Sequence, residues 1–255
     1  MEKTRRNIVK EFSKQVKPME SSKLFTDQDI LEKIVNISKL SEKMTVLDAG
    51  CGPGIVTEAL APYVKEIIAY DLTPAMTEAT KRRCIKAGIQ NVKYQTGTIE
   101  SLPYENDYFD RVISRLVVHH LQEPQKAFKE VYRVLKKDGV FILADIVSSE
   151  DTQKAKLHNA LEVLRDPSHS RMLPPSELIN SLEKLGYNVS VAEKWVNERE
   201  FKEWIAITNS PERIEPLRTI MSELAKCGND AGVNLKVDEK TVSFDHNWVL
   251  ITATK

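Results

Sequence analysis

Cysteine and closely spaced histidine are scarce in this sequence. Its 3 cysteines among 255 residues, Cys51, Cys84 and Cys227, stand far apart with no CxxC pair. That pattern argues against a disulfide framework and a zinc site, and it predicts a reducing, cytoplasmic location. Because the 5 histidines show no HxxxH or HExxH spacing, we also expect no metal centre.

Net charge and long apolar runs are absent as well. Lys plus Arg equals Asp plus Glu, 37 each, so no overall field attracts phosphates and we expect no nucleic-acid partner. No apolar run approaches the roughly 18 residues of a membrane-spanning helix, and no apolar segment follows residues 1–6 as in a secretory signal. We therefore expect a globular protein without stable membrane insertion. The composition is equally compatible with a monomer and a homo-oligomer.

The positions of the apolar residues predict an α/β fold. Short apolar runs, each expected to form a strand, alternate with amphipathic helical patterns. The runs stand at 44–49, 66–70, 91–95, 109–114 and 139–146, and the helical patterns at 54–64, 74–88 and 124–137. This alternation indicates a doubly wound, mostly parallel sheet with helices on both faces. Ligands of such a sheet bind beyond the C-terminal ends of its strands.

The flanking segments predict helical cover around this core. Residues 4–17 form a basic amphipathic pattern that is expected to pack on the domain, and a second helix is expected from Thr26, as N-cap, to Leu40. Helical patterns at 150–165, 200–208 and 211–226 and strands at 187–195 and 241–254 follow the core. We expect one domain, 1–255. It consists of an N-terminal helical cover (1–40), a cofactor-binding core (41–147), and substrate-side helices with closing strands (148–255).

A glycine-rich loop, Asp48-Ala49-Gly50-Cys51-Gly52-Pro53-Gly54, follows the first predicted strand. Its glycines bring backbone N–H groups close to a ligand at the start of the next helix. A dinucleotide fingerprint requires its third glycine at position 55, which is Ile55, so an NAD(P)-dependent oxidoreductase is disfavoured. Asp48 would repel a diphosphate but can hold an ammonium group, directly or through water. The loop therefore favours a cofactor with an amino-acid end and no phosphate.

Asp71 ends the second predicted strand, 17 residues beyond Gly54. An acid at this place accepts hydrogen bonds from both ribose hydroxyls of a nucleoside cofactor. Alone, Asp71 is equally compatible with a solvated turn, but its spacing from the glycine loop favours a ribose site. Leu72, the next residue, would lie against the adenine.

With these motifs the sequence resembles the class I S-adenosylmethionine-dependent methyltransferases, and within them the branch of the quinone-biosynthesis C-methyltransferases. The resemblance covers roughly residues 40–147. Its motifs are the glycine loop at 46–54, Asp71, the segment 97–104 with Tyr108-Phe109-Asp110, and the helix-to-strand turn at 131–139. It implies a Rossmann-like, seven-stranded sheet, S-adenosyl-L-methionine as cofactor and methyl transfer to a small-molecule acceptor. The alternative is an S-adenosylmethionine-binding protein with other chemistry or a regulatory role.

The resemblance also implies which residues bind the cofactor. They are Asp48, Gly50, Gly52, Asp71, Leu72, Thr98, Ile99 and Arg115. The family usually has Asp at the position of Thr98, where it accepts from the adenine amino group. The Thr98 hydroxyl accepts more weakly than a carboxylate, unless Glu100 takes over the contact. Arg115 is expected either to bind the cofactor carboxylate or to pair with a nearby acid.

Candidate catalytic residues follow the fourth and fifth predicted strands. A sulfonium methyl donor is already activated, so the protein mainly aligns the acceptor, with a base where a proton must leave. His120 is either that base or a residue that shapes the loop. Asp145, at the end of the fifth predicted strand, either orients the acceptor or accepts its proton, or it fixes a loop. His169 and Arg171, in a polar patch at 166–171, are candidate acceptor contacts.

Overall fold

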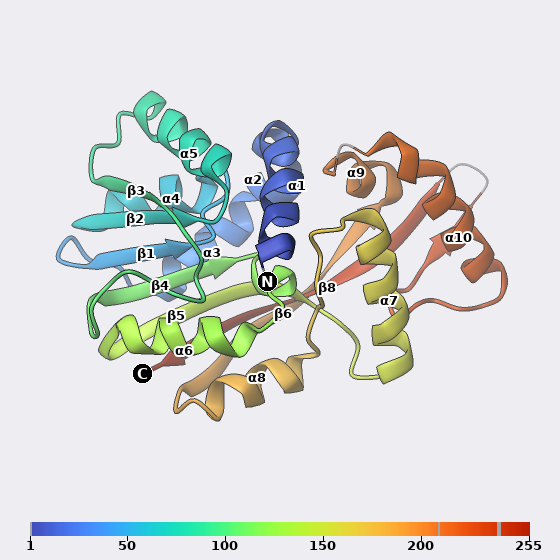
Figure 1. Cartoon of the computed structure of the whole chain (residues 1–255). Helices are drawn as coiled ribbons and strands as arrows, with labels where there is room; N and C mark the ends of the chain where they lie inside the picture. Colours follow the sequence, from blue (N-terminus) through green and yellow to red (C-terminus); the bar gives the residue numbers. More distant parts are fainter. Residues whose placement is uncertain (1, 209, 239–240) are drawn as a thin grey trace.

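A single twisted β-sheet with helices on both faces forms the centre of the computed structural model, which describes residues 2–208, 210–238 and 241–255 (Figure 1). The strand order is β3-β2-β1-β4-β5-β8-β6, with the short β7 paired to β8. The strands are β1 (Thr45–Ala49), β2 (Glu66–Asp71), β3 (Val92–Thr96), β4 (Phe109–Arg115), β5 (Leu135–Val147), β6 (Asn188–Glu200), β7 (Lys236–Val237) and β8 (Val242–Thr254). The first five strands in this order, β3, β2, β1, β4 and β5, run parallel to one another. Strand β8 runs antiparallel to both β5 and β6. This confirms the doubly wound, mostly parallel sheet predicted from the sequence.

Apolar runs form the inner strands because both faces of the sheet are covered. Val112 and Ile113, neighbours on β4, are both fully buried. Adjacent side chains on a strand point to opposite faces. Accordingly, Val112 packs with α6 (Pro124–Val134) and α8 (Pro175–Glu183), whereas Ile113 packs with the helices on the other face. Those helices include α3 (Gln28–Ser38) and α4 (Ile55–Leu60).

The N-terminal helix α1 (Glu2–Ser21) lies between α5 (Pro74–Lys86) and the C-terminal helices, near the C-terminal ends of the parallel strands (Figure 1). Its Val16 and Met19 pack on Met76 of α5 in one apolar cluster. This confirms that the amphipathic segment packs on the domain. Among the described residues, none of the helices has the length and apolar character needed to cross a membrane.

The second helix begins later than the sequence predicted. Thr26 ends a short helix, α2 (Lys23–Thr26), and α3 starts at Gln28. Asp27 is the N-cap, because its carboxylate accepts hydrogen bonds from the N–H groups of Asp29 and Ile30. A carboxylate here also interacts favourably with the positive end of the helix, so Asp27 replaces the predicted Thr26.

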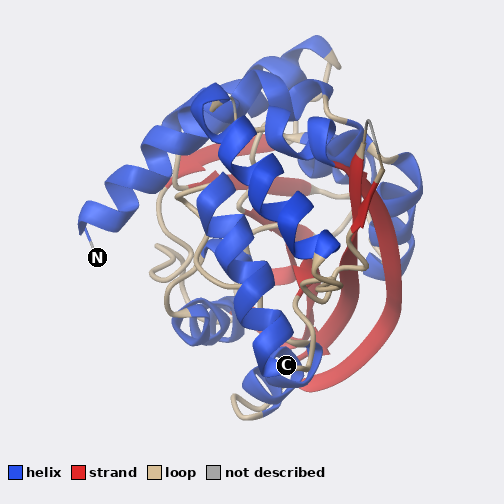
Figure 2. Cartoon of the chain, turned by 90° about the vertical axis from the view of Figure 1, so that its right-hand side faces the viewer, coloured by secondary structure: helices blue, strands red, loops and turns tan. Residues whose placement is uncertain are grey.

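Strands β6 and β8 are as long as β5 and much longer than β1 to β4. Each has 13 residues, and they extend past the parallel sheet as a curved antiparallel ribbon (Figures 1 and 2). The ribbon packs against α7 (Thr152–Arg165), α9 (Phe201–Ala206) and α10 (Ile214–Lys226). The sequence predicted a strand at 187–195, which corresponds to β6, but β6 continues to Glu200.

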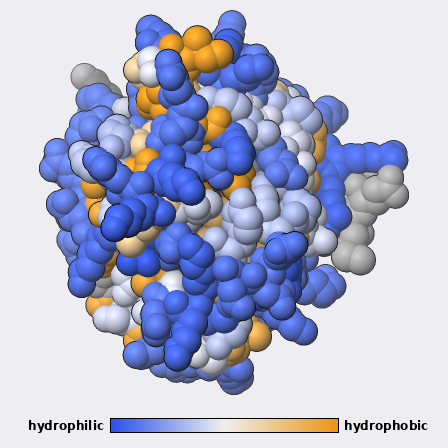
Figure 3. Space-filling view, turned by 90° about the vertical axis from the view of Figure 1, so that its left-hand side faces the viewer, coloured by the Kyte–Doolittle hydropathy of each residue, from blue (hydrophilic) through white to orange (hydrophobic). Residues whose placement is uncertain are grey.

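The opposite edge of the sheet, at β3, is polar. Figure 3 shows the side of the molecule at the N-terminal ends of the parallel strands, where hydrophilic side chains dominate and hydrophobic groups are scattered between them. Lys93 of β3 is exposed and pairs with Glu66 of β2, Nζ to Oε2 at 2.5 Å. A charged residue on an edge strand hinders pairing with another chain.

Candidate active site

The glycine loop turns from β1 into α4 through three residues with left-handed backbone conformations. The φ angles are 83° at Gly50, 52° at Gly52 and 85° at Gly54. A Cβ at Gly50 would lie 2.3 Å from Val117 Cγ2, and one at Gly54 would lie 2.9 Å from Thr80 Cα. A Cβ at Gly52 would meet no atom within 4 Å. Gly50 and Gly54 are therefore required for packing, and Gly52 only for its backbone conformation.

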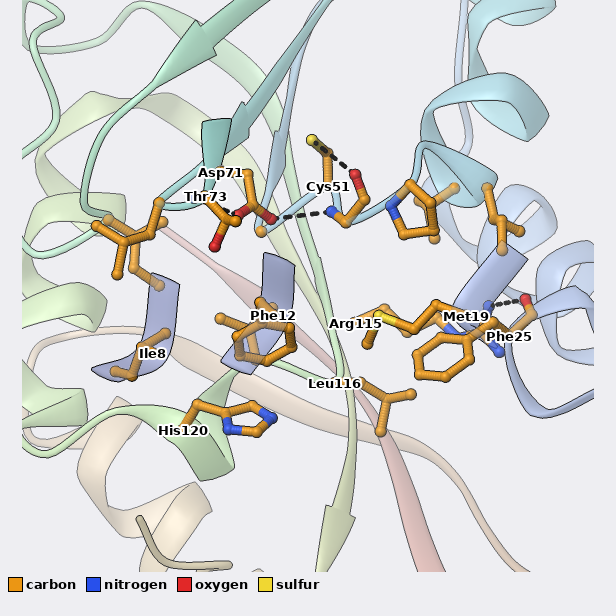
Figure 4. A pocket seen from close by; sticks show the side chains of 18 of the residues that line it. Ile8, Phe12, Met19, Phe25, Cys51, Asp71, Thr73, Arg115, Leu116 and His120 are labelled. Carbon is orange, nitrogen blue, oxygen red and sulfur yellow. Dashed lines mark hydrogen bonds between the residues drawn. The ribbon is translucent and has the colours of Figure 1, made fainter. Parts of the chain in front are cut away.

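A cavity opens beyond the C-terminal ends of the strands, where the fold predicts a ligand. It encloses about 890 Å³, open solvent included. We call it the larger cavity. Of the predicted cofactor-binding residues, those on its wall are Gly50, Gly52, Asp71, Leu72, Thr98, Ile99 and Arg115. Figure 4 shows Asp71 across this cavity from His120, with Phe12 of α1 between them.

Asp71 is held in place by two backbone hydrogen bonds. Its Oδ2 accepts from Gly52 N at 3.0 Å and its Oδ1 accepts from Thr73 N at 2.8 Å. Burial raises the pKa of Asp71 even though both hydrogen bonds favour the carboxylate. Each carboxylate oxygen retains further acceptor capacity for a ligand hydroxyl.

Asp48 lies behind the glycine loop rather than on the cavity wall. It is 1% exposed, and its Oδ2 accepts from the Thr57 hydroxyl at 2.5 Å. Burial, with the nearby charge of Asp71, raises the pKa of Asp48 to about 7. Asp48 was expected to hold a ligand ammonium either directly or through water. This geometry does not provide the direct contact.

Arg115 connects the larger cavity to the N-terminal segment. Its Nη1 and Nη2 donate to the carbonyl oxygens of Phe25 and Leu24, at 2.8 and 2.7 Å. Its buried Nε has no hydrogen-bond partner among the described residues. The guanidinium thus fixes the chain at α2, lines the cavity and leaves its Nε without a partner among the described residues.

Thr98 and Ile99 line the larger cavity, whereas Glu100 does not. The Thr98 hydroxyl donates to Glu100 Oε2 at 3.2 Å, and Arg5 Nη2 of α1 donates to the same oxygen at 2.7 Å. Glu100 is therefore tied to α1. This leaves Thr98 as the residue at the usual adenine position.

Asp145 is fully engaged in fixing the loop after β4. Its Oδ1 lies 2.5 Å from His119 Nδ1, and its Oδ2 accepts from the N–H groups of Val117 and Val118 at 3.2 and 2.7 Å. The residue is 1% exposed and does not line the larger cavity. This geometry favours the loop-fixing alternative and does not place the carboxylate against a ligand.

His120 lines the larger cavity, and its proton position follows from its partner. Its Nδ1 lies 3.0 Å from the Ser168 carbonyl oxygen, which can only accept, so Nδ1 carries the proton and Nε2 keeps a lone pair. Burial, with the nearby His119, lowers the pKa of His120 to about 4. His120 is therefore a neutral imidazole at physiological pH, with an unprotonated nitrogen.

The structure does not bring His169 or Arg171 to a cavity wall. His169 Nε2 donates to Asn159 Oδ1 at 3.0 Å, behind the wall. Arg171 N donates to the His119 carbonyl oxygen, but its half-exposed side chain points away and pairs with Glu177. These geometries do not support the expected acceptor contacts.

A smaller cavity adjoins the larger one and was not predicted from the sequence. It encloses about 420 Å³, open solvent included. Four residues line both cavities: Met19, Phe25, Leu116 and His120. Leu116 has a φ of 59°, a conformation uncommon for a non-glycine residue and frequent at functional sites. The charged side chains on the wall of the smaller cavity include Arg165, Asp166 and Arg199.

A buried cluster near the smaller cavity also escaped sequence analysis, because one member comes from the distant strand β8. Potential ligand atoms of His158, Glu162 and His246 all lie within 4.8 Å of one another. Glu162 already accepts from Trp204 Nε1 at 3.1 Å, from His246 Nε2 at 2.9 Å and from Arg165 Nε at 3.0 Å. A carboxylate bonded to a guanidinium is a poor site for a cation, so the cluster does not favour a metal.

This combination of parallel sheet, glycine loop and acid at the end of β2 fits a class I S-adenosylmethionine-dependent methyltransferase. The "Methyltransferase domain" family matches residues 47–143. The chain is 33% identical over 250 residues to the uncharacterized methyltransferase YcgJ of Bacillus subtilis strain 168, covering 96% of this chain and 97% of that protein. The chain therefore belongs to the methyltransferase family, and its cofactor is S-adenosylmethionine.

Solved structures share the fold of this chain. The crystal structure of YcgJ superposes with a TM-score of 0.84 at 31% identity, over 89% of this chain and 98% of that one. A Haemonchus contortus phosphoethanolamine N-methyltransferase, in complex with S-adenosylhomocysteine, shares the fold at a TM-score of 0.61 and 17% identity, over 89% of this chain and 53% of that one. The C-methyltransferase UbiE of Zymomonas mobilis is 27% identical over 144 residues, which are 54% of this chain and 60% of that protein.

Proposed function

We propose that this methyltransferase acts on a small molecule bound in the smaller cavity. The observation that carries the proposal is the junction between the two cavities, formed by Met19, Phe25, Leu116 and His120. An acceptor in the smaller cavity would reach a methyl donor in the larger one across this junction. Alignment of two bound reactants in this way contributes much of the acceleration in such reactions.

The residues of the larger cavity suit S-adenosylmethionine. Asp71 offers acceptor oxygens to the ribose hydroxyls, and the unpartnered Nε of Arg115 offers a donor to the cofactor carboxylate. We propose that buried Asp48 contributes negative charge behind the loop, on the side of the cofactor ammonium. When bound, S-adenosylmethionine supplies an electrophilic methyl group. The acceptor forms a bond to that carbon as the sulfur–carbon bond breaks, with S-adenosylhomocysteine as the leaving group.

His120 is the residue best placed to remove a proton from the acceptor. It lines both cavities, and the Ser168 carbonyl holds its Nδ1 proton so that Nε2 is the basic nitrogen. We propose that Nε2 takes the proton when the accepting atom is an O–H, N–H or C–H group. Asp145, through the loop it fixes, is a positioning residue.

Enclosure of the smaller cavity supports a small acceptor over a macromolecule. Gln15 and Met19 of α1 form part of its wall, and Gln15 Nε2 donates to Asp166 Oδ2 at 3.0 Å. This bond links the N-terminal helix to the segment after α7.

We also propose a cytoplasmic location, supported by the free thiols of Cys51, Cys84 and Cys227.

The test is a screen for acceptor-dependent release of S-adenosylhomocysteine from the full-length protein. Small organic acceptors are compared with unmodified transfer RNA and with unfolded protein. We expect release with one class of small compound only. Stable binding of S-adenosylhomocysteine without release in any arm would favour a regulatory or non-methylating protein, and release with a macromolecule would overturn the proposal.

A thermal-shift control separates the cofactor class from the acceptor class. S-adenosylhomocysteine should stabilise the protein and NAD(H) should not, because only a ligand that binds the native state raises the melting temperature.

A further inference from the structure

The smaller cavity contains a buried guanidinium that the rest of the protein leaves unsatisfied. Arg199, near the end of β6, is 3% exposed and lies on the cavity wall. Its Nε, Nη1 and Nη2 make no hydrogen bond with the described residues. Its ion-pair partner is Glu203, whose Oε1 lies 3.6 Å from Nη2 and whose side chain is 41% exposed. A buried charge without hydrogen bonds is unfavourable in the folded protein, so a ligand that supplies them gains correspondingly.

The other charges around this cavity already have close partners. Arg165 Nε donates to Glu162 Oε2 at 3.0 Å. Asp166 accepts from Gln15 Nε2 at 3.0 Å and from the Ser168 hydroxyl at 2.6 Å. Arg199 is therefore the charged side chain on this wall whose hydrogen-bonding groups remain free among the described residues.

A second polar atom on the same wall lacks a partner. His246 lies on the cavity wall, and its Nε2 donates to Glu162 Oε1 at 2.9 Å, since a carboxylate only accepts. Its buried Nδ1 then carries a lone pair, and it has no hydrogen-bond partner among the described residues. The wall thus offers one cationic donor and one neutral acceptor. Around them lie apolar side chains, including Trp204, Ile207 and Ile146.

We infer that the methyl acceptor is a small organic anion, whose carboxylate or phosphate binds Arg199 and whose hydroxyl or N–H group donates to His246 Nδ1. The inference rests on the proposed function, because it assigns the acceptor to the smaller cavity. Arg199, unlike Arg165, has no carboxylate within hydrogen-bond distance, so it disfavours a cationic group beside it. The apolar part of the wall suits the carbon skeleton of the acceptor.

The experiment measures anion binding to the full-length protein saturated with S-adenosylhomocysteine. Acetate, inorganic phosphate and neutral acetamide are titrated at constant ionic strength, with thermal shift and calorimetry as readouts. We expect stabilisation by acetate or phosphate and none by acetamide, which matches acetate in size. The tighter of the two anions tells a carboxylate acceptor from a phosphate acceptor. Equal responses to acetate, phosphate and acetamide would overturn the inference.

Variants assign the response to one side chain. Arg199→Met should weaken anion binding about tenfold or more, with S-adenosylhomocysteine affinity unchanged and unliganded thermal stability equal or higher. Arg171→Met, which removes a guanidinium outside both cavities, should keep the response. Wild-type anion binding in Arg199→Met, or unfolding of that variant, would contradict the inference.

Glu203→Gln tests whether Arg199 serves only its ion pair. We expect this variant to bind the anion as well as or better than the wild type. Loss of both stability and anion binding would assign Arg199 to the ion pair instead. Methyl transfer to a neutral acceptor without anion binding would refute this inference alone, whereas anion binding without transfer to any small molecule would refute the proposed function.

Discussion

Asp71→Asn should weaken binding of S-adenosylhomocysteine by about two orders of magnitude and leave the fold intact. Each carboxylate oxygen of Asp71 already accepts one backbone N–H, from Thr73 and Gly52. A carboxylate has about four acceptor sites, so roughly one remains on each oxygen for a ribose hydroxyl. A hydrogen bond to a charged group contributes about 1.5–3 kcal/mol. Losing one and weakening the other costs about 3 kcal/mol, on the order of 100-fold in Kd.

Stability should fall modestly in this variant, because the amide nitrogen of Asn cannot accept one of the two backbone N–H groups of Gly52 and Thr73, whereas removing a charge that burial disfavours offsets part of that loss. The matched control is Asp151→Asn, because Asp151 also accepts two backbone N–H bonds, from Gln153 and Lys154, but caps α7 outside the cavity. Calorimetry with S-adenosylhomocysteine and denaturant unfolding are measured on both variants. Unchanged affinity in Asp71→Asn, or an equal loss in Asp151→Asn, would refute the assigned ribose contact.

Three further predictions concern residues around the larger cavity. His120→Ala should lower kcat by about 10²-fold or more if Nε2 is the base, with S-adenosylhomocysteine affinity unchanged; equal turnover would return His120 to a loop-shaping role. Asp48→Asn should stabilise the unliganded protein more at pH 8 than at pH 5. The pKa of Asp48 is raised to about 7 from 3.8, so its contribution to stability is lost as pH rises through that interval; a pH-independent difference in urea unfolding would contradict this. Gly54→Ala should destabilise the fold by about 2 kcal/mol, and more than Gly88→Ala, because both have positive φ but only Gly54 has a close backbone neighbour; equal losses in urea unfolding would argue against the contact with Thr80.

The cofactor half of the site is readable from the sequence because its signals are local. Gly50, Gly52 and Asp71 stand at strand ends within one short stretch, and strand ends of a parallel sheet meet at one edge. Asp48 shows the limit of this reasoning. Its place beside the loop is evident from the sequence, but only the structure shows that it bonds to Thr57 and lies behind the wall.

The proposed acceptor half of the site was not predicted from the sequence because it depends on long-range packing. Arg199 lies beyond the predicted strand end, in the polar run Asn197–Glu200, where no apolar periodicity marks a buried side chain. His246 reaches the cavity because β8 pairs with β6 along their full length, Asn197 being opposite His246. By contrast, the polar patch at His169 and Arg171 gave a clear sequence signal, yet its side chains turn away from the cavities.

The most direct test of the central claim follows the methyl group itself. The full-length protein is incubated with methyl-labelled S-adenosylmethionine and with separate small-molecule and macromolecular fractions of a cell extract. The account predicts that label enters dialysable compounds, in an amount that depends on the small-molecule fraction and falls sharply in Asp71→Asn. Label in protein or nucleic acid, or no transfer from a protein that binds S-adenosylhomocysteine, would contradict it.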